Sequence, residues 1–423
     1  MRNCRAPLNG LEANNSRRFL LARFNVDYIS GFKTVGGIEK ALLNLSIPES
    51  TGSANDNTPS PSERENERRM DDVYNRIVDS IRNLPQAINR KYAFRALSWI
   101  GYATRTLNAR ELLVAICVEP GQYQLNDKDM HTLEDLLDIC NGLVVVDDSE
   151  RVADDSEKAV RLIHFSVRNY LDRNKVIPED TRETYRAITC STYLSFDIIK
   201  EQHWPPWRRR DLIRHLPFLY YAANNLAFHL SMVEYGHYPE TTSAILKILE
   251  DKEHRHAYCN INGGFLRRLE IPRLNLACAI GYEDAVRTLL KEDGVDVNAR
   301  DTEYGRTPLI WAAGMGHEAV VMQLLDNRDV KVNAKDTNTS LTPLSWAVLR
   351  RNEAVVRHLL SEGRVDQNCK DRKGRTPLSF EIQAGDKNRR ILQLLLEKGV
   401  EVNFTYSVVS QFDLDKTRWY WRC

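Results

Sequence analysis

Short clusters of apolar residues, spaced as on one side of a helix, come in pairs along the C-terminal part of the chain. In one pair, Leu309 and Ala312 lie three residues apart, and a second cluster follows after two glycines. Each cluster is shorter than the roughly 12–15 residues at which an isolated helix becomes marginally stable. The pattern therefore predicts paired helices that stack on neighbouring pairs and bury their apolar sides together.

These pairs follow one another at a fixed interval. The pentapeptide GRTPL at 305–309 returns at 374–378, with the near copy SLTPL at 340–344 between them. A Thr–Pro step suits a helix start, because the Thr hydroxyl accepts from an unpaired backbone N–H and Pro has no N–H to lose. The interval is 35 residues when it is counted on Asn298, Asn333, Asn368 and Asn403. A repeat of this length indicates a helical solenoid.

The units resemble the ankyrin repeat, whose pattern T-P-L-x-x-A-x-x-x-G is met nearly in full by the second and third units. The first unit lacks Thr–Pro, and the last unit has Glu381 in place of the alanine. We interpret such departures as polar caps of the solenoid. We predict about four ankyrin repeats over 271–404, with the first and last degenerate, followed by an irregular tail at 405–423.

The resemblance implies a concave protein-binding surface, made by the turns and the inner helices of units two to four. The positions that it leaves free for a partner are Thr302, Glu303, Tyr304, Arg306, Gly314, Met315, Thr337, Asn338, Thr339, Leu341, Leu349, Arg350, Arg372, Lys373, Arg375, Gln383 and Ala384. For any single position, a solvated turn residue is the more common alternative. We expect a protein partner and a scaffold function.

In front of the repeats, apolar spacing predicts helices on both sides of a polar stretch. Residues 1–47 carry two such helices, whereas 48–69 are dense in Ser, Pro, Asn and Glu and predict a disordered linker. Asn108 and Glu111 have the spacing of a capping box and predict another helix start. Between the polar stretch and Asn108, apolar residues at helical spacing predict a further helix: Val73, Ile77, Ile81 and Leu84.

A β-hairpin is predicted next. Two apolar runs, Leu143–Val146 and Val160–Phe165, flank a charged loop, and a further helix follows. Helices, a hairpin with a polar tip and another helix are the layout of a winged helix, which we assign to 70–175, with a helical connector at 176–270. We therefore expect a mainly α protein: a helical and winged-helix N-terminal region with one β-hairpin, followed by an α-solenoid of ankyrin repeats.

The order of these parts is similar to the C-terminal portion of fungal STAND proteins of the NACHT–ankyrin kind. The resemblance implies that 1–47 is a remnant of the end of a NACHT-type NTPase module, and that the chain is the lid and sensor arm of a signalling protein. The family's phosphate loop, G-x-x-x-x-G-K-[ST], has no counterpart, because Gly-Lys occurs nowhere in the chain. We expect that the NTPase core is missing and that no cofactor binds. The likeness is carried by Phe19–Gly31, Asp71–Ile81, Cys140–Asp147 and Leu162–Leu171.

Composition narrows the class of protein further. The chain of 423 residues is 42% hydrophobic and 28% charged, with a net charge of +1, so no overall field attracts nucleic acid or anionic membranes. The longest wholly apolar run, Leu112–Val118, is far shorter than the roughly 18–20 residues of a membrane span. The eight cysteines form no CxxC pair. We expect a soluble protein of the cytoplasm, with the nucleus as the alternative compartment and no membrane partner.

Few residues offer catalytic or metal chemistry. No HExxH or GxSxG motif occurs, which favours a protein that is not an enzyme. His254, His256, Cys259 and Cys278 could supply zinc ligands, but the lack of paired cysteines favours a chance cluster and no metal site. His164 lies within an apolar predicted strand, and we interpret it as structural.

One stretch leaves a second function open. The segment Trp204–His215 mixes aromatic residues with the arginines at 208–210, and a winged helix can bind DNA. The simpler interpretation is a proline-rich surface loop that leads into a helix. Nucleic-acid binding through the winged helix and the Arg208–Arg210 cluster is therefore kept as the alternative to a protein partner. Such binding would fall steeply with salt.

Overall fold

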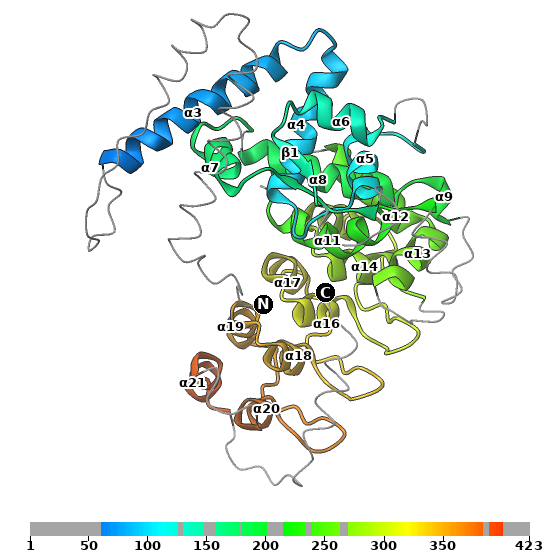
Figure 1. Cartoon of the computed structure of the whole chain (residues 1–423). Coiled ribbons are helices and arrows are strands. Elements are labelled where there is room, and N and C mark those ends of the chain that lie inside the picture. Colours follow the sequence, from blue (N-terminus) through cyan, green and yellow to red (C-terminus); the bar gives the residue numbers. More distant parts are fainter. Residues whose placement is uncertain are drawn as a thin grey trace, which may run out of the picture. The chain divides into compact units, whose positions relative to one another are not determined.

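Helices dominate the computed structural model, which describes residues 61–125, 130–147, 157–177, 179–200, 215–233, 239–262, 270–383 and 389–400 (Figure 1). The strands β1 (Val144–Val146) and β2 (Val160–Leu162) form one two-stranded antiparallel sheet. The helices before the repeats are α3 (Pro61–Arg82), α4 (Ala87–Tyr102), α5 (Ala109–Cys117), α6 (Leu133–Ile139), α7 (Phe165–Arg173), α8 (Glu179–Leu194), α9 (Asp197–Lys200), α11 (Leu219–Ser231), α12 (Pro239–Glu250) and α13 (Lys252–Asn262).

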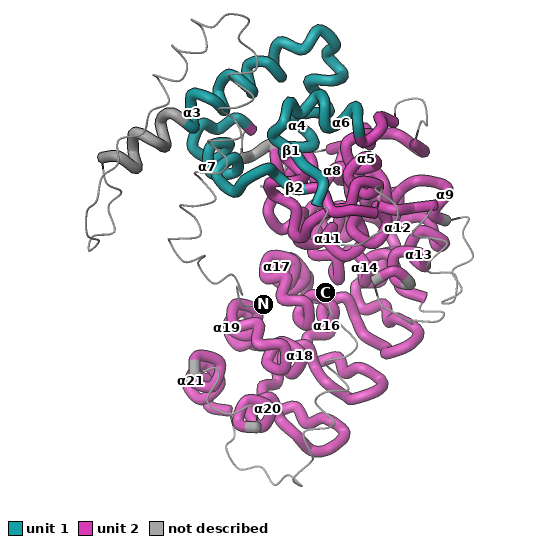
Figure 2. Tube along the Cα trace, in the orientation of Figure 1, with its two compact units in different colours: residues 1–97, 134–147, 161–176 teal, residues 98–133, 148–160, 177–423 magenta. Residues whose placement is uncertain are grey.

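Contacts divide the chain into two compact units (Figure 2). Unit 1 consists of residues 1–97, 134–147 and 161–176. Unit 2 consists of residues 98–133, 148–160 and 177–423. The domain boundaries predicted from the sequence stay predictions, because this division groups contacts and does not delimit sequence families.

Helix α3 begins earlier than the sequence predicts. The polar composition predicts disorder through residue 69, but residues 61–69 form the first turns of α3. Pro61 at the first helical position and Glu63 in the first turn both suit a helix N-terminus, which explains why a polar segment can be helical here. The predictions for residues 1–47 and 48–60 lie outside the described part of the chain.

In unit 1, helix α3 packs against α7 through tyrosines. The hydroxyl groups of Tyr74 and Ser166 lie 2.8 Å apart, and the Tyr170 hydroxyl donates to Asn75 Oδ1 at 2.7 Å. The rings of the two tyrosines are 5.2 Å apart. The buried side of α3 is therefore centred on Tyr74, one residue beyond the predicted Val73, because a tyrosine can bury its ring and still satisfy its hydroxyl.

The hairpin has shorter strands than predicted. The N–H of Ile163 donates to the Leu143 carbonyl at 2.9 Å. His164 then caps α7 by accepting the Ser166 N–H on Nδ1 at 3.2 Å, so Phe165 begins a helix instead of ending a strand. The predicted structural role of His164 is thus a helix cap. A polar side chain that accepts an orphan N–H ends the strand and starts the helix at the same place.

The core of unit 2 between α4 and α11 is built on Trp99, which is fully buried. Helix α8 packs against both α11 and α12. Four aromatic rings contact Trp99 edge-on, and such contacts add to the stabilisation that burial of the ring provides. The rings that meet Trp99 edge-on, with centroids 5.3 to 6.2 Å away, belong to Tyr185, Phe218, Tyr221 and His229.

A chain of hydrogen bonds crosses the same core. The N–H of Thr104 donates to the Tyr221 hydroxyl at 3.1 Å, which lies 3.0 Å from His229 Nε2. His229 Nδ1 lies 2.9 Å from Glu183, and Glu183 also pairs with the buried Arg186. A neutral His229 that donates through Nδ1 and accepts the Tyr221 proton on Nε2 satisfies every group in this chain.

The repeats stack as two layers of helices. Inner helices contact inner helices, and outer helices contact outer ones. Leu309, Leu344 and Leu378 are each at most 1% exposed, as the repeat register predicts. The inner helices are α14 (Arg273–Ile280), α16 (Pro308–Met315), α18 (Pro343–Arg350) and α20 (Pro377–Gln383), and the outer helices are α15 (Glu283–Leu290), α17 (Glu318–Leu325), α19 (Glu353–Ser361) and α21 (Arg389–Glu397).

A ladder of asparagines joins successive repeats. Asn298 donates from its amide nitrogen to the Asp329 carbonyl at 2.8 Å and accepts the Lys331 N–H at 2.7 Å. Asn333 forms the same pair of bonds one unit later, with the Arg364 carbonyl as its acceptor at 2.8 Å. The 35-residue spacing of the asparagines in the sequence is therefore the spacing of an interaction between units.

The helices in front of the repeats extend this stack. Helix α12 contacts α14 and α15. The hydroxyls of Thr242 and Tyr282 lie 2.9 Å apart, and Arg255 Nε donates to the Ile271 carbonyl at 3.1 Å. The pair α12 and α13 thus covers the apolar side of the first repeat, which would otherwise face solvent.

Candidate protein-interaction surface

A buried aspartate organises each of the turns before units two, three and four. Asp301 accepts the N–H groups of Tyr304 and Arg306, at 2.7 and 3.1 Å, and the indole N–H of Trp311 at 2.9 Å. Asp336 accepts the Trp346 indole in the same way, at 2.8 Å. The carboxylate thereby fixes the turn and also ties it to the inner helix that follows.

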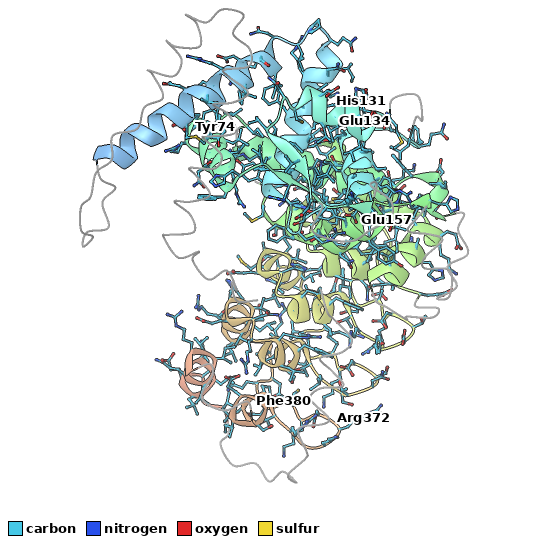
Figure 3. The ribbon with its side chains drawn as sticks, in the orientation of Figure 1. Tyr74, His131, Glu134, Glu157, Arg372 and Phe380 are labelled. Carbon is cyan, nitrogen blue, oxygen red and sulfur yellow. The ribbon has the colours of Figure 1, made fainter. Side chains whose placement is uncertain are left out.

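The last described turn replaces this indole bond with an ion pair. Phe380 occupies the tryptophan position and has no N–H, so Asp371 instead pairs with Arg375 at 2.7 Å. The guanidinium of Arg375 lies 4.7 Å from the Phe380 ring. Figure 3 shows Arg372 on this turn and Phe380 on helix α20. The turn keeps its shape while the chemistry at its base changes.

The threonines of the repeat motif cap the inner helices as predicted. Thr307, Thr342 and Thr376 each accept the N–H three residues later, at distances of 3.2 to 3.4 Å. Each of the three is followed by proline at the first helical position. The Thr–Pro step therefore sets where the inner helices α16, α18 and α20 begin, and with it which of their residues reach the inner surface.

Neighbouring turns are joined through their backbones. The N–H of Thr302 donates to the Glu270 carbonyl at 3.2 Å, and the N–H of Thr337 donates to the Tyr304 carbonyl at 2.8 Å. The N–H of Arg372 continues the series one turn later. The exposed tips of the turns are thus held in a fixed row, so their side chains reach a partner from a rigid base.

A small pocket opens on the inner helices of units two and three. The Arg306 guanidinium lies 4.5 Å from the Trp346 ring centre and 5.1 Å from that of Trp311. Arg350 lies 5.8 Å from Trp346. Burial lowers the pKa of Arg306, although Asp301 opposes this shift. The residues that line the pocket are Arg306, Ile310, Trp311, Gly314, Met315, Trp346 and Arg350.

The structure separates the predicted binding residues into three groups by exposure. Exposed side chains belong to Thr302, Glu303, Thr337, Asn338, Arg372 and Lys373. Half-buried positions are Gly314, Met315, Thr339, Leu349, Arg350 and Arg375. Buried side chains are those of Tyr304, Arg306 and Leu341. The side chain of Gln383 and residue Ala384 lie outside what the structure describes.

Two of the predicted positions need correction. Leu341 is 1% exposed, because it lies directly before the helix cap Thr342 and packs into the repeat core. It cannot contact a partner from there. Tyr304 is 6% exposed and lies under the guanidinium of Arg306 at 4.4 Å, so it supports the surface rather than forming it.

Sequence reasoning missed three pocket residues. Ile310, Trp311 and Trp346 line the pocket, although the repeat pattern assigns them to the core. A tryptophan ten residues after Asp301 and after Asp336 was the available signal, since a buried indole N–H needs an acceptor. The pattern alone does not tell which ring edge reaches the surface.

The other candidate sites from the sequence are the His254–Cys278 cluster and the Arg208–Arg210 cluster. Among the described residues, no three His, Cys, Asp or Glu side chains are placed to hold a metal ion. His254 Nε2 lies 3.1 Å from the Phe196 carbonyl, and burial raises the pKa of the Cys259 thiol to about 12. The Arg208–Arg210 cluster lies outside the described residues. In the described ranges, no helix is both long and apolar enough to cross a membrane.

Comparison with known families agrees with this architecture. Residues 219–336 and 330–406 match the family described as ankyrin repeats (3 copies), and residues 82–181 match the winged helix domain of GPI inositol-deacylase. The chain is mainly helical and combines a winged-helix domain, which holds the one hairpin of the described residues, and ankyrin repeats. The ankyrin match begins at Leu219, inside the predicted connector. No curated protein matches the chain.

Proposed function

We propose that this chain is a non-catalytic interaction protein that binds a protein partner through the inner surface of its ankyrin repeats. The observation that carries the proposal is the pocket beside Met315 and Arg350, set among turn tips that hydrogen bonds hold in a fixed row. Apolar walls with a few charged groups are typical of the centre of a protein interface. The matched family, ankyrin repeats, is used in other proteins for protein binding.

We propose in addition that the chain serves as the sensor arm of a STAND-type signalling protein in the cytoplasm. The support is the order of the two family matches, a winged helix followed by ankyrin repeats, which is the order in the family that the sequence resembles. The sensor role would require partner binding and no nucleotide chemistry by this chain. Specific binding of ATP by the purified chain would contradict it.

Site-specific crosslinking tests the interaction surface. A photoreactive amino acid is placed at Met315, on the inner helix, or at Met322, which is 46% exposed on the outer helix of the same repeat. In cells, the residue at 315 should capture a discrete protein and the one at 322 should not. Equal capture at both positions, or none at 315, would show that the inner surface is not the interface.

A further inference from the structure

Positive charge gathers toward the C-terminal end of the inner surface. Arg350 ends helix α18, and Arg372 and Lys373 lie exposed on the next turn. At the other end, Glu303 is exposed and Glu270 is ion-paired with a lysine at 2.5 Å. The whole chain carries a net charge of +1, so the basic character described here is local and not a property of the overall composition.

A partner cannot contact the turn aspartates directly. Asp301, Asp336 and Asp371 are 2%, 3% and 8% exposed. Their carboxylates accept hydrogen bonds from the turns and from the helix or arginine below, as described above. A partner therefore meets the guanidinium and ammonium groups and not these carboxylates.

The pocket lies next to this basic end. The residues that line it include Ile310, Met315, Trp311 and Trp346, together with Arg350. A Cβ added at Gly314 would come within 3.8 Å of Trp346, which is ordinary contact, so the glycine leaves room beside the ring. The recess is shallow, with a volume of about 10 Å³, which is room for about one water molecule. An aliphatic side chain of a partner would therefore lie across its mouth, with a neighbouring carboxylate against the Arg350 guanidinium.

We propose that the partner presents an acidic segment, with one apolar side chain across the mouth of this pocket and carboxylates against Arg350, Arg372 and Lys373. This inference rests on the proposed function and names the chemistry of its partner. Charge complementarity selects the acidic segment, and the apolar recess fixes its position along the surface.

A nucleic acid is the less suitable polyanion for this surface. Binding of single strands depends on aromatic faces on which bases stack. Trp311 and Trp346 are 2% and 4% exposed, and the Arg306 guanidinium lies over both rings. The described inner surface therefore offers charge to a phosphate chain but no open tryptophan face to a base.

The test measures binding of labelled probes to the full-length chain by fluorescence anisotropy. The probes are a Glu-rich peptide with one central leucine, the same peptide with alanine for leucine, its lysine counterpart, and a single-stranded oligonucleotide of similar length. The Glu–Leu peptide should bind best, with its Kd rising about tenfold when the leucine is replaced. Equal binding of the lysine peptide, or tighter binding of the oligonucleotide, would overturn the proposal.

Matched variants locate the site. Arg350→Glu and Lys373→Glu should each weaken the Glu–Leu peptide about tenfold, whereas Arg328→Glu, the same charge reversal in the loop after α17, should not. Gly314→Leu should block the pocket, while Gly363→Leu, at an open position away from the pocket, should not. Unchanged thermal melting shows that a variant is folded. If Gly314→Leu binds the peptide as well as the wild type does, the pocket is not the site.

The outcome also separates this inference from the proposed function. If position 315 captures a protein but the peptides show no acidic preference, the partner chemistry assigned here is wrong and the interaction surface stands. If position 315 captures nothing and no peptide binds, both are wrong.

Discussion

Two glycines at the end of α16 differ in what a side chain would meet. Gly314 has an ordinary helical backbone, and an added Cβ would only touch Trp346 at 3.8 Å. Gly316 has φ of +85°, and its Cβ would come within 2.8 Å of Asn352 Oδ1. The Asn352 amide also donates to the Ala313 carbonyl at 2.8 Å, so it has little freedom to move.

Opposite effects on stability are expected from the same substitution at these two positions. Gly314→Ala should stabilise the repeats by about 0.5–1 kcal/mol, because alanine loses less backbone entropy in a helix. Gly316→Ala should destabilise them by at least about 1–2 kcal/mol, the cost of a left-handed alanine. Thermal unfolding of both variants measures this. A lower melting temperature for Gly314→Ala would mean that the position is not helical as described.

At the scale of single residues, the sequence predicts what local chemistry decides. The caps at Thr307, Thr342 and Thr376 and the buried leucines two residues later follow from the Thr–Pro–Leu motif. The stacking of Arg306 over two tryptophans could not be predicted, because Trp346 comes from the next repeat. Contacts between repeats depend on packing that the repeat pattern does not specify.

Among the elements, α8 and α11 are joined by a pH-sensitive contact. Burial raises the pKa of Glu183, but hydrogen bonds from His229 and Arg186 outweigh burial and lower it to about 2. Burial also lowers the pKa of His229, although its hydrogen bond to Glu183 opposes this. Both groups therefore favour folding at neutral pH, in the charge states in which the hydrogen-bond chain is complete.

Acid should weaken the packing of these two helices in two stages. The unfolded chain binds the histidine proton near pH 6.5 and the folded chain binds it only at lower pH, so stability falls as pH drops below about 6.5. Protonation of Glu183 adds a second loss between about pH 4.5 and pH 2. The melting temperature of His229→Gln, measured against pH, should show a smaller first stage. Part of that stage remains, because burial also lowers the pKa of His317. An identical pH profile would show that His229 is not buried as a neutral ring.

Element types were easier to predict than their limits. The capping box at Asn108 and Glu111 is present, with bonds of 2.8 and 3.1 Å, because four consecutive residues contain all of its chemistry. The start of α3 and the end of β2 differ from the predictions. The polar residues before Met70 suit either a linker or the first turns of a helix, and His164 suits either a strand or a helix cap. Tertiary contacts, such as the one between the Tyr74 and Ser166 hydroxyls, decide which structure forms.

On the scale of the whole chain, the order of helices, hairpin and solenoid could be predicted, since each part has its own periodicity. How far the stack of helices extends in front of the first repeat could not be predicted. Helices α12 and α13 lack the Thr–Pro–Leu motif, yet α12 packs on the first repeat and the ankyrin match begins before it. Helices that only cover the apolar side of a repeat must fit its shape but need not carry the repeat motif. Their sequence therefore gives little indication that they belong to the stack.

A deletion tests whether the stack depends on unit length. Residues 299–333 make up one full interval of 35 residues. Their removal should leave a folded chain with a lower melting temperature, because one joint between units, with its inner-helix and outer-helix contacts, is lost. Removal of 299–328 shifts the remaining units out of phase and should abolish cooperative melting. Circular dichroism follows both. Similar melting of the two proteins would contradict the role given to the spacing.

The asparagine ladder is the reason why removal of 35 residues should leave a folded chain. In the shortened chain, Asn298 would stand where Asn333 stands and would reach the Arg364 carbonyl in place of that of Asp329. The rungs at Asn298 and Asn333 each join an asparagine side chain to backbone groups, so either asparagine can make the contacts of the other. Such a chain can gain or lose whole units during evolution and still fold, and the length of its binding surface can change without redesign of its joints.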